Sequence, residues 1–171
     1  MGDYKDSKKQ IEIIKNAIID SDNQAAYNEA CRLLTEGKYL DAESAFMKLG
    51  SFSDSANKAK QAKEMYLETA YQDALALLDS KDYTSAITAF RALGDYLDSG
   101  ERLNKACYLK AEELLSAGKY DEAIAMFNSL GSYEDSKNRA SEAESLKKAA
   151  AYSAAEALAA KGRTYEAAVA F

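Results

Sequence analysis

The sequence contains no proline and no histidine, and only two of its 171 residues are cysteine. Proline breaks helix interiors, so its absence, together with abundant alanine, leucine, glutamate and lysine, favours helix throughout and argues against a β-rich fold. The absence of histidine removes the commonest general base and metal ligand. We therefore expect an all-α protein that is not an enzyme and binds no metal.

Signals for cofactors and disulfides are equally scarce. Cys31 and Cys107 lie at different positions of the repeat described below, so we expect two free thiols. The run Asp20-Ser21-Asp22 faintly resembles a calcium loop, but the glycine and the bidentate glutamate of such a loop are missing. No glycine-rich phosphate loop is present either. The sequence predicts no cofactor.

Charge and hydropathy restrict the kinds of partner. The chain has 22 basic and 28 acidic residues, a net charge of −6, and the acids are spread along it. An evenly acidic surface disfavours nucleic acid and anionic membranes as partners. No apolar run approaches the ~18 residues of a membrane span, and the N-terminus lacks the apolar core of a signal peptide. We expect a soluble chain, cytoplasmic by default, whose partner is a protein or a peptide.

One pattern occurs four times, with its turn at Gly37, Lys81, Gly118 and Gly162. The successive copies are 44, 37 and 44 residues apart. A period in this range is typical of stacked copies of one supersecondary unit. We therefore expect a single α-solenoid over residues 1–171, with repeats at about 7–50, 54–94, 98–131 and 135–171.

Each repeat resolves into two helices, which we name helix A and helix B. Helix A has an apolar stripe, as in Tyr108, Ala111 and Leu114, and helix B has one that includes Ala123 and Phe127. A Leu-Gly pair ends helix B, an aromatic residue follows, and an Asp-Ser pair begins the next helix A. Glycine at the turn between A and B accepts a positive φ. Lys81 holds that position in the second repeat, which predicts a different turn there.

The repeats differ in length only between the Asp-Ser pair and the tyrosine of helix A. Additions of 7 and 11 residues are close to whole helical turns, so they predict longer A helices, Ser55–Asp79 against Ser99–Ser116. The run Ser21-Asp22-Asn23 could break the first of these helices. We also expect the isoleucines at its start (Ile11, Ile13, Ile14, Ile18 and Ile19) to be covered by Ala62, Met65 and Tyr66.

The run Ala111…Gly118-x-Tyr120-x-x-Ala123-x-x-x-Phe127 resembles the tetratricopeptide repeat, a helix–turn–helix unit of about 34 residues. Two features depart from the family: Leu-Gly-x-Tyr-x-Asp-Ser replaces its closing proline, and the periods are longer. The resemblance implies antiparallel helix pairs in a right-handed superhelix whose A helices line a concave peptide groove. Residues 2–7 match the end of a repeat without a repeat before them, so we also expect the chain to be one segment of a larger bacterial protein.

The groove candidates are the helix A tyrosines and one acid: Tyr27, Tyr71, Tyr108, Tyr152 and Glu112. Recurrent tyrosine could offer an aromatic strip to a peptide, or the same rings could pack between helices. The lysine and asparagine with which some family members grip a carboxylate are absent. These features predict a non-enzymatic protein-interaction scaffold. The alternative is a structural spacer or self-stacking rod that associates end to end, in which the tyrosines are buried instead of exposed.

Phe127→Ala inside the array should lower the free energy of unfolding by ~3–5 kcal/mol, because it leaves a cavity. Phe171→Ala, at the outer end of the fourth repeat, should cost far less. Urea unfolding of both variants measures the difference. Equal losses would contradict a linear stack.

Overall fold

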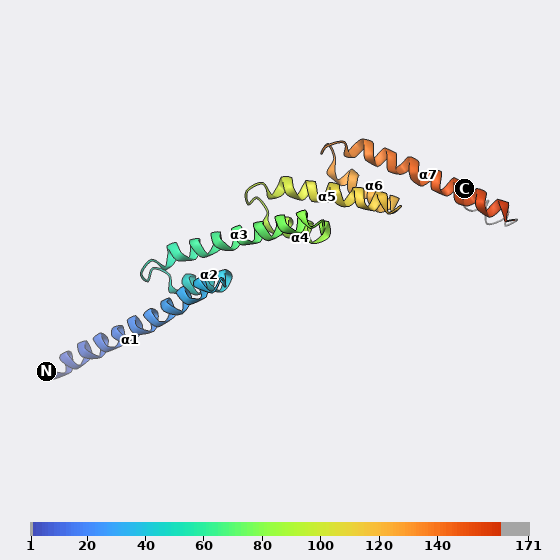
Figure 1. Ribbon diagram of the computed structural model, residues 1–171. Coiled ribbons are helices and arrows are strands. Elements are labelled where there is room, and N and C mark those ends of the chain that lie inside the picture. Colours follow the sequence, from blue (N-terminus) through green and yellow to red (C-terminus); the bar gives the residue numbers. More distant parts are fainter. Residues whose placement is uncertain (1, 162–171) are drawn as a thin grey trace. The chain divides into compact units, whose positions relative to one another are not determined.

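The computed structural model describes residues 2–161, and this part of the chain consists of seven α-helices without a strand (Figure 1). The all-α prediction is confirmed. The helices are α1 (Gly2–Thr35), α2 (Tyr39–Leu49), α3 (Ser55–Asp79), α4 (Tyr83–Leu93), α5 (Ser99–Ser116), α6 (Tyr120–Leu130) and α7 (Ser136–Ala160). Phe171 and the second helix expected in the fourth repeat lie outside the described residues.

The chain divides into two compact units, Met1–Ala70 and Tyr71–Phe171, and the division falls within α3. The core of the N-terminal unit consists of Ala30, Ala42, Phe46, Ala59 and Ala62. A corresponding core in the C-terminal unit contains Ala111, Leu114, Leu115, Ala123, Phe127, Ala140 and Ala143. Small alanines let the helix backbones approach closely around a large phenylalanine, and Phe46 and Phe127 are fully buried.

The predicted long helices are confirmed. α3 and α5 begin and end at the expected residues, so the extra length of α3 is continuous helix. The possible break at Ser21–Asn23 does not occur, since α1 runs unbroken from Gly2 to Thr35. Without glycine or proline in this run, each polar residue costs a helix only a few tenths of a kcal/mol, to about 0.7 kcal/mol.

The prediction that the first isoleucines are covered is wrong. Ile11, Ile13 and Ile14 are 52–58% exposed, as are Ile18 and Ile19 at 55%. Ala62, which was expected to cover them, is instead buried in the cluster with Ala30 and Phe46. The start of α3 thus packs against the second half of α1 and against α2, and the first half of α1 extends past α2 (Figure 1).

The prediction of a different turn at Lys81 is also wrong. Lys81 has φ 64°, close to the 72° of Gly118 at the same position. The amides of Lys81 and Asp82 donate to the carbonyls of Leu78 and Leu77, at 3.1 and 2.9 Å. Gly118 and the residue after it make the same pair of bonds. The Asp82 carboxylate also accepts the amide of Ser85 at 3.2 Å, a cap that α2 and α6 lack.

Lys81→Gly should raise the free energy of unfolding by up to ~1 kcal/mol, because a left-handed backbone strains a residue that has a Cβ. Urea unfolding at neutral pH is the measurement. Lys81→Ala is the control and should not stabilise, since alanine meets the same strain. A glycine variant no more stable than the parent would show that Asp82 already offsets the strain at this turn.

Candidate functional site

In three repeats the helix A tyrosine has the same surroundings. The ring of Tyr108 meets Phe127 edge-on at 5.6 Å between centroids and Tyr133 at 6.2 Å. Its hydroxyl donates to the Asp135 carboxylate at 2.5 Å, and Asp135 directly precedes α7. The same contacts join Tyr27 to Phe46, Phe52 and Asp54, and Tyr71 to Phe90, Tyr96 and Asp98. Each tyrosine therefore ties its own helix B to the start of the next helix A.

These hydrogen bonds shift the acidity of the groups involved. The carboxylates of Asp54 and Asp135 accept hydrogen bonds from the protonated phenols, and burial adds to the effect, so the pKa of Tyr27 and of Tyr108 is raised to about 12. The pKa of Tyr71 is raised for the same reason, by Asp98. Reciprocally, the hydroxyl of Tyr71 lowers the pKa of Asp98. The hydroxyls thus act as donors to the protein's own carboxylates.

Glu112, the acidic groove candidate, is held in a similar way by the next helix. Arg139 donates through Nε to Oε1 of Glu112 at 2.5 Å and through a second nitrogen to Oε2. The two side chains are 29% and 25% exposed. The pair raises the pKa of Arg139, and Arg139 also donates to Glu142. A two-point contact of this kind fixes both side chains, so Glu112 contributes to the junction between α5 and α7.

The predicted groove residues do not share one environment. Tyr71 is buried, at 7% exposure, and Tyr27 and Tyr108 are half-buried. Tyr152 is the exception, with 61% of its surface exposed. Packing between helices therefore accounts for three of the tyrosines, and Tyr152 is the member of the set with the largest surface for a partner.

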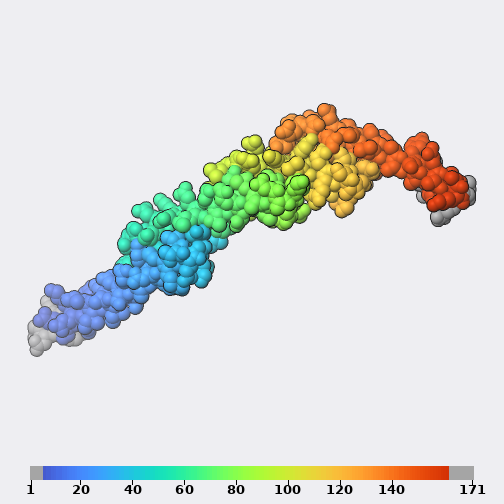
Figure 2. Space-filling view, in the orientation of Figure 1, coloured from blue at the N-terminus to red at the C-terminus, as the bar shows by residue number. Residues whose placement is uncertain are grey.

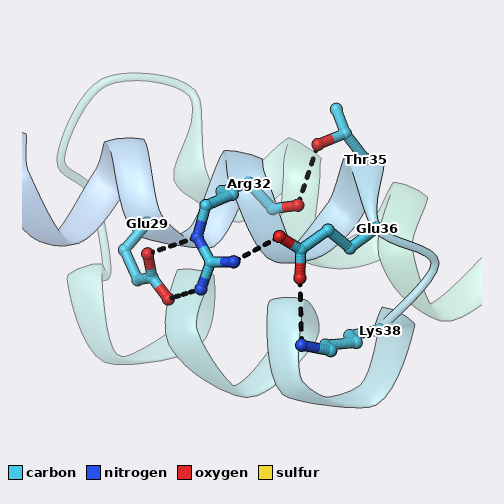
Figure 3. Close-up of polar contacts among 5 residues, drawn as sticks. All are labelled: Glu29, Arg32, Thr35, Glu36 and Lys38. Carbon is cyan, nitrogen blue, oxygen red and sulfur yellow. Dashed lines mark hydrogen bonds and ion pairs between the residues drawn. The ribbon is translucent and has the colours of Figure 1, made fainter.

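A further polar cluster lies at the end of α1 in the N-terminal unit (Figure 3). Arg32 donates to both carboxylate oxygens of Glu29, at 2.8 and 2.6 Å, and also to Glu36. Lys38 contacts the other oxygen of Glu36 at 2.9 Å. These contacts lower the pKa of Glu29 and of Glu36. The charges are mutually matched and exposed, which is typical of a solvated network that supports the turn between α1 and α2.

An apolar cavity that was not predicted from the sequence lies in the N-terminal unit, between α2 and the first turns of α3. The cavity measures 510 Å³, and its lining includes Met47, Ala56 and Ala59, with Lys60 and Lys63 among the polar residues. Met47 is 66% exposed. Leu40, about two helical turns earlier on the same side of α2, is 51% exposed. The first repeat therefore carries exposed apolar side chains beside an open hollow.

Comparison of the repeats explains this cavity and could have predicted it. At the position of Glu43 the second and third repeats have Ile87, which is buried, and Ile124, which packs on the core. At the positions of Leu40 and Met47 they have polar residues: Thr84 and Arg91 in α4, Asp121 and Asn128 in α6. In the first repeat, the charged Glu43 thus replaces the inward-facing isoleucine. The apolar Leu40 and Met47 replace polar residues on the exposed side of α2. Without the isoleucine, the space beside Ala59 is left open.

Other candidate chemistry is limited. Within residues 2–161, no group of three or more acidic or sulfur ligands could hold a metal ion. No helix in that range is long and apolar enough to cross a membrane. Cys31 and Cys107 are free, half-buried thiols, and burial raises the pKa of Cys107. A thiol with a raised pKa is a poor nucleophile, so Cys107 is not an activated group.

Comparison of the chain with protein-family models, with curated proteins and with solved structures finds no match.

Asp135→Asn should bring the ionisation of Tyr108 back towards the ordinary tyrosine pKa of ~10, because a neutral amide accepts a weaker hydrogen bond than the carboxylate and carries no charge. In the parent protein, folded Tyr108 keeps its proton up to about pH 12, whereas the unfolded residue loses it near 10. The stability contribution of this contact is therefore complete below pH ~10 and is lost as the pH rises towards 12.

Ultraviolet titration of phenolate, together with urea unfolding at intervals across that pH range, measures both effects. Tyr108→Phe is the companion variant, since it removes the same ionising group while keeping the ring. Both variants should lose stability less steeply with rising pH than the parent does. An unchanged phenolate titration in Asp135→Asn would show that the carboxylate does not control this tyrosine.

Proposed function

We propose that the chain is a non-enzymatic scaffold of the tetratricopeptide type that binds another protein, with helix pairs stacked into a right-handed superhelix. Its support is the threefold recurrence of one contact, in which a tyrosine hydroxyl binds the carboxylate 27 residues later. A contact repeated at a constant separation, despite helices of different length, is what a stack of equivalent units requires. Rigid stacks of this kind present preformed binding surfaces to partners.

The apolar cavity beside α2 is the observation that carries the binding role. Exposed Met47 lines it, and exposed Leu40 lies with Met47 at a second hollow on α2. Apolar side chains beside a hollow are typical of protein contact sites. Lys60 and Lys63 at the cavity complement acidic groups. The partner that fits is a segment with apolar side chains for the cavity and carboxylates for the two lysines. The helix A surface around Tyr152 is a second candidate contact of the same scaffold.

A structural spacer is the alternative function, and one observation favours it. In a spacer the helix A tyrosines serve only the contacts between repeats, and Tyr71 is buried with its hydroxyl bound to Asp98. Tyr27 and Tyr108 make the same kind of contact. A scaffold binds a protein other than itself, whereas a spacer does not.

Capture from a lysate of the source organism on the immobilised chain tests the proposal. Leu40→Lys/Met47→Lys should lose the captured partner, because two charges enter the apolar face. Thr84→Lys/Asn128→Lys alters the equivalent positions of the other repeats and should retain it.

Tyr152→Ser tests the helix A surface in the same experiment. If only this variant loses the partner, the binding site is the helix A surface around Tyr152 and not the cavity. A parent chain that captures no protein other than itself would overturn the scaffold and support the spacer.

A further inference from the structure

The cavity between α2 and α3 departs from the repeat pattern on its α3 wall as well as at Glu43. This wall carries Lys60 and Lys63, which lie three residues apart and therefore on one face of the helix. They stand five and eight residues after the serine that begins α3. In α5 and α7 the equivalent positions hold no lysine: Asn104, Cys107, Ser141 and Glu144. Both helices that border the cavity thus differ from the other repeats at the same place.

Neither lysine is neutralised by another described residue. Lys60 and Lys63 form no ion pair within residues 2–161, whereas Lys58 on the same helix contacts Asp54 at 4.0 Å. The half-buried Glu43 lines the same cavity, which therefore carries two positive charges and one negative charge. A local excess of positive charge on a chain with a net charge of −6 favours an acidic partner at this place.

The walls of the cavity are two helix faces. Figure 2 shows that the surface of α2 adjoins that of the first turns of α3, and the two helices share a buried cluster. On α2 the lining residues Glu43 and Met47 are one turn apart. On α3 the small Ala56 and Ala59 line the cavity at the start of the helix, and Lys63 follows Ala59 by one turn. A groove between two helices, with small side chains at its floor, lets a third helix approach closely.

We propose that this cavity binds one α-helix of the partner, with a branched aliphatic side chain in the cavity and acidic residues one turn away on Lys60 and Lys63. The aliphatic side chain takes the place that Ile87 and Ile124 have in the second and third repeats. Because Ala59 and Lys63 are one turn apart, a helix lying along α3 meets them with residues that are also about one turn apart. This binding mode rests on the proposed function and adds the conformation of the partner segment and the spacing of its contacts.

Selection of random peptides displayed on phage, with the immobilised full chain as the target, tests the binding mode. The selected peptides should share a leucine, isoleucine or valine with an aspartate or glutamate three or four residues away. A synthetic copy of one selected peptide should gain helical circular dichroism when the chain is added. Proline placed between its two contact residues should abolish binding, because proline breaks a helix interior.

Reversal of the two charges tests the role of the lysines. Lys60→Glu/Lys63→Glu should weaken binding of the synthetic peptide about tenfold in fluorescence anisotropy, since two attractive contacts become repulsive. The same variant should select peptides with lysine or arginine in place of the acids. Lys105→Glu/Lys137→Glu is the matched control, because it alters two exposed lysines elsewhere and changes the net charge by the same amount. It should bind the peptide like the parent.

Glu43→Ile tests the cavity itself. This substitution restores the side chain of the second and third repeats, so it should fill the cavity and abolish binding of the synthetic peptide. Urea unfolding should show that the variant is at least as stable as the parent, so that the loss of binding does not reflect misfolding.

The binding mode is wrong if the parent chain selects no peptide, or if the selected peptides lack acidic residues or bind without gaining helix. It is also wrong if the peptide binds Glu43→Ile or Lys60→Glu/Lys63→Glu as tightly as it binds the parent. In each of these cases the scaffold still stands if the parent captures another protein from the lysate. A parent chain that selects no peptide and captures no other protein overturns both proposals.

Discussion

The fold depends on one contact, the tyrosine of helix A held between two aromatic rings with its hydroxyl on a carboxylate. In the third repeat the rings are Phe127 and Tyr133, and the carboxylate is Asp135. The phenylalanine lies on the paired helix B, and the carboxylate lies at the start of the next helix A. One side chain therefore joins three successive elements. Because its ring is apolar and its hydroxyl is polar, tyrosine can fill the core and satisfy the helix start together, which phenylalanine cannot do.

The same contact allows the helices to vary in length without disturbing the array. α3 and α7 have 25 residues and α5 has 18, yet the residue seven positions after the first serine is a fully buried alanine in each: Ala62, Ala143 and Ala106. A difference of seven residues is close to two turns, so the buried face keeps its direction along the longer helix. The turn between A and B is equally tolerant, since Lys81 adopts the conformation of Gly118. The backbone conformation of this turn is therefore the same in two repeats that have different residues there.

The distribution of apolar surface separates structural positions from candidate binding positions. The aromatic residues, which first suggested a peptide groove, are mostly used in holding repeats together. Apolar side chains that no described residue covers lie at positions where one repeat departs from the others: Met47 beside Glu43, and Ile14 in place of an alanine. Departures from an internal pattern are thus better indicators of binding in this chain than the pattern itself. A residue that recurs in every repeat is expected to make a structural contact that every repeat requires.

The sequence by itself determined the helix content, the limits of α3 and α5 and the phenylalanine cores, because helix periodicity and caps are local properties. It also identified Tyr108 and Glu112 as notable without showing which surface they face. Only the tertiary structure decided that Asp135 binds the Tyr108 hydroxyl, that Arg139 binds Glu112, and that Ile14 is exposed. Each of these depends on which neighbouring helix lies against a given face. The two hydrogen-bonded pairs join residues 27 positions apart, and no local rule of the sequence contains such a relation.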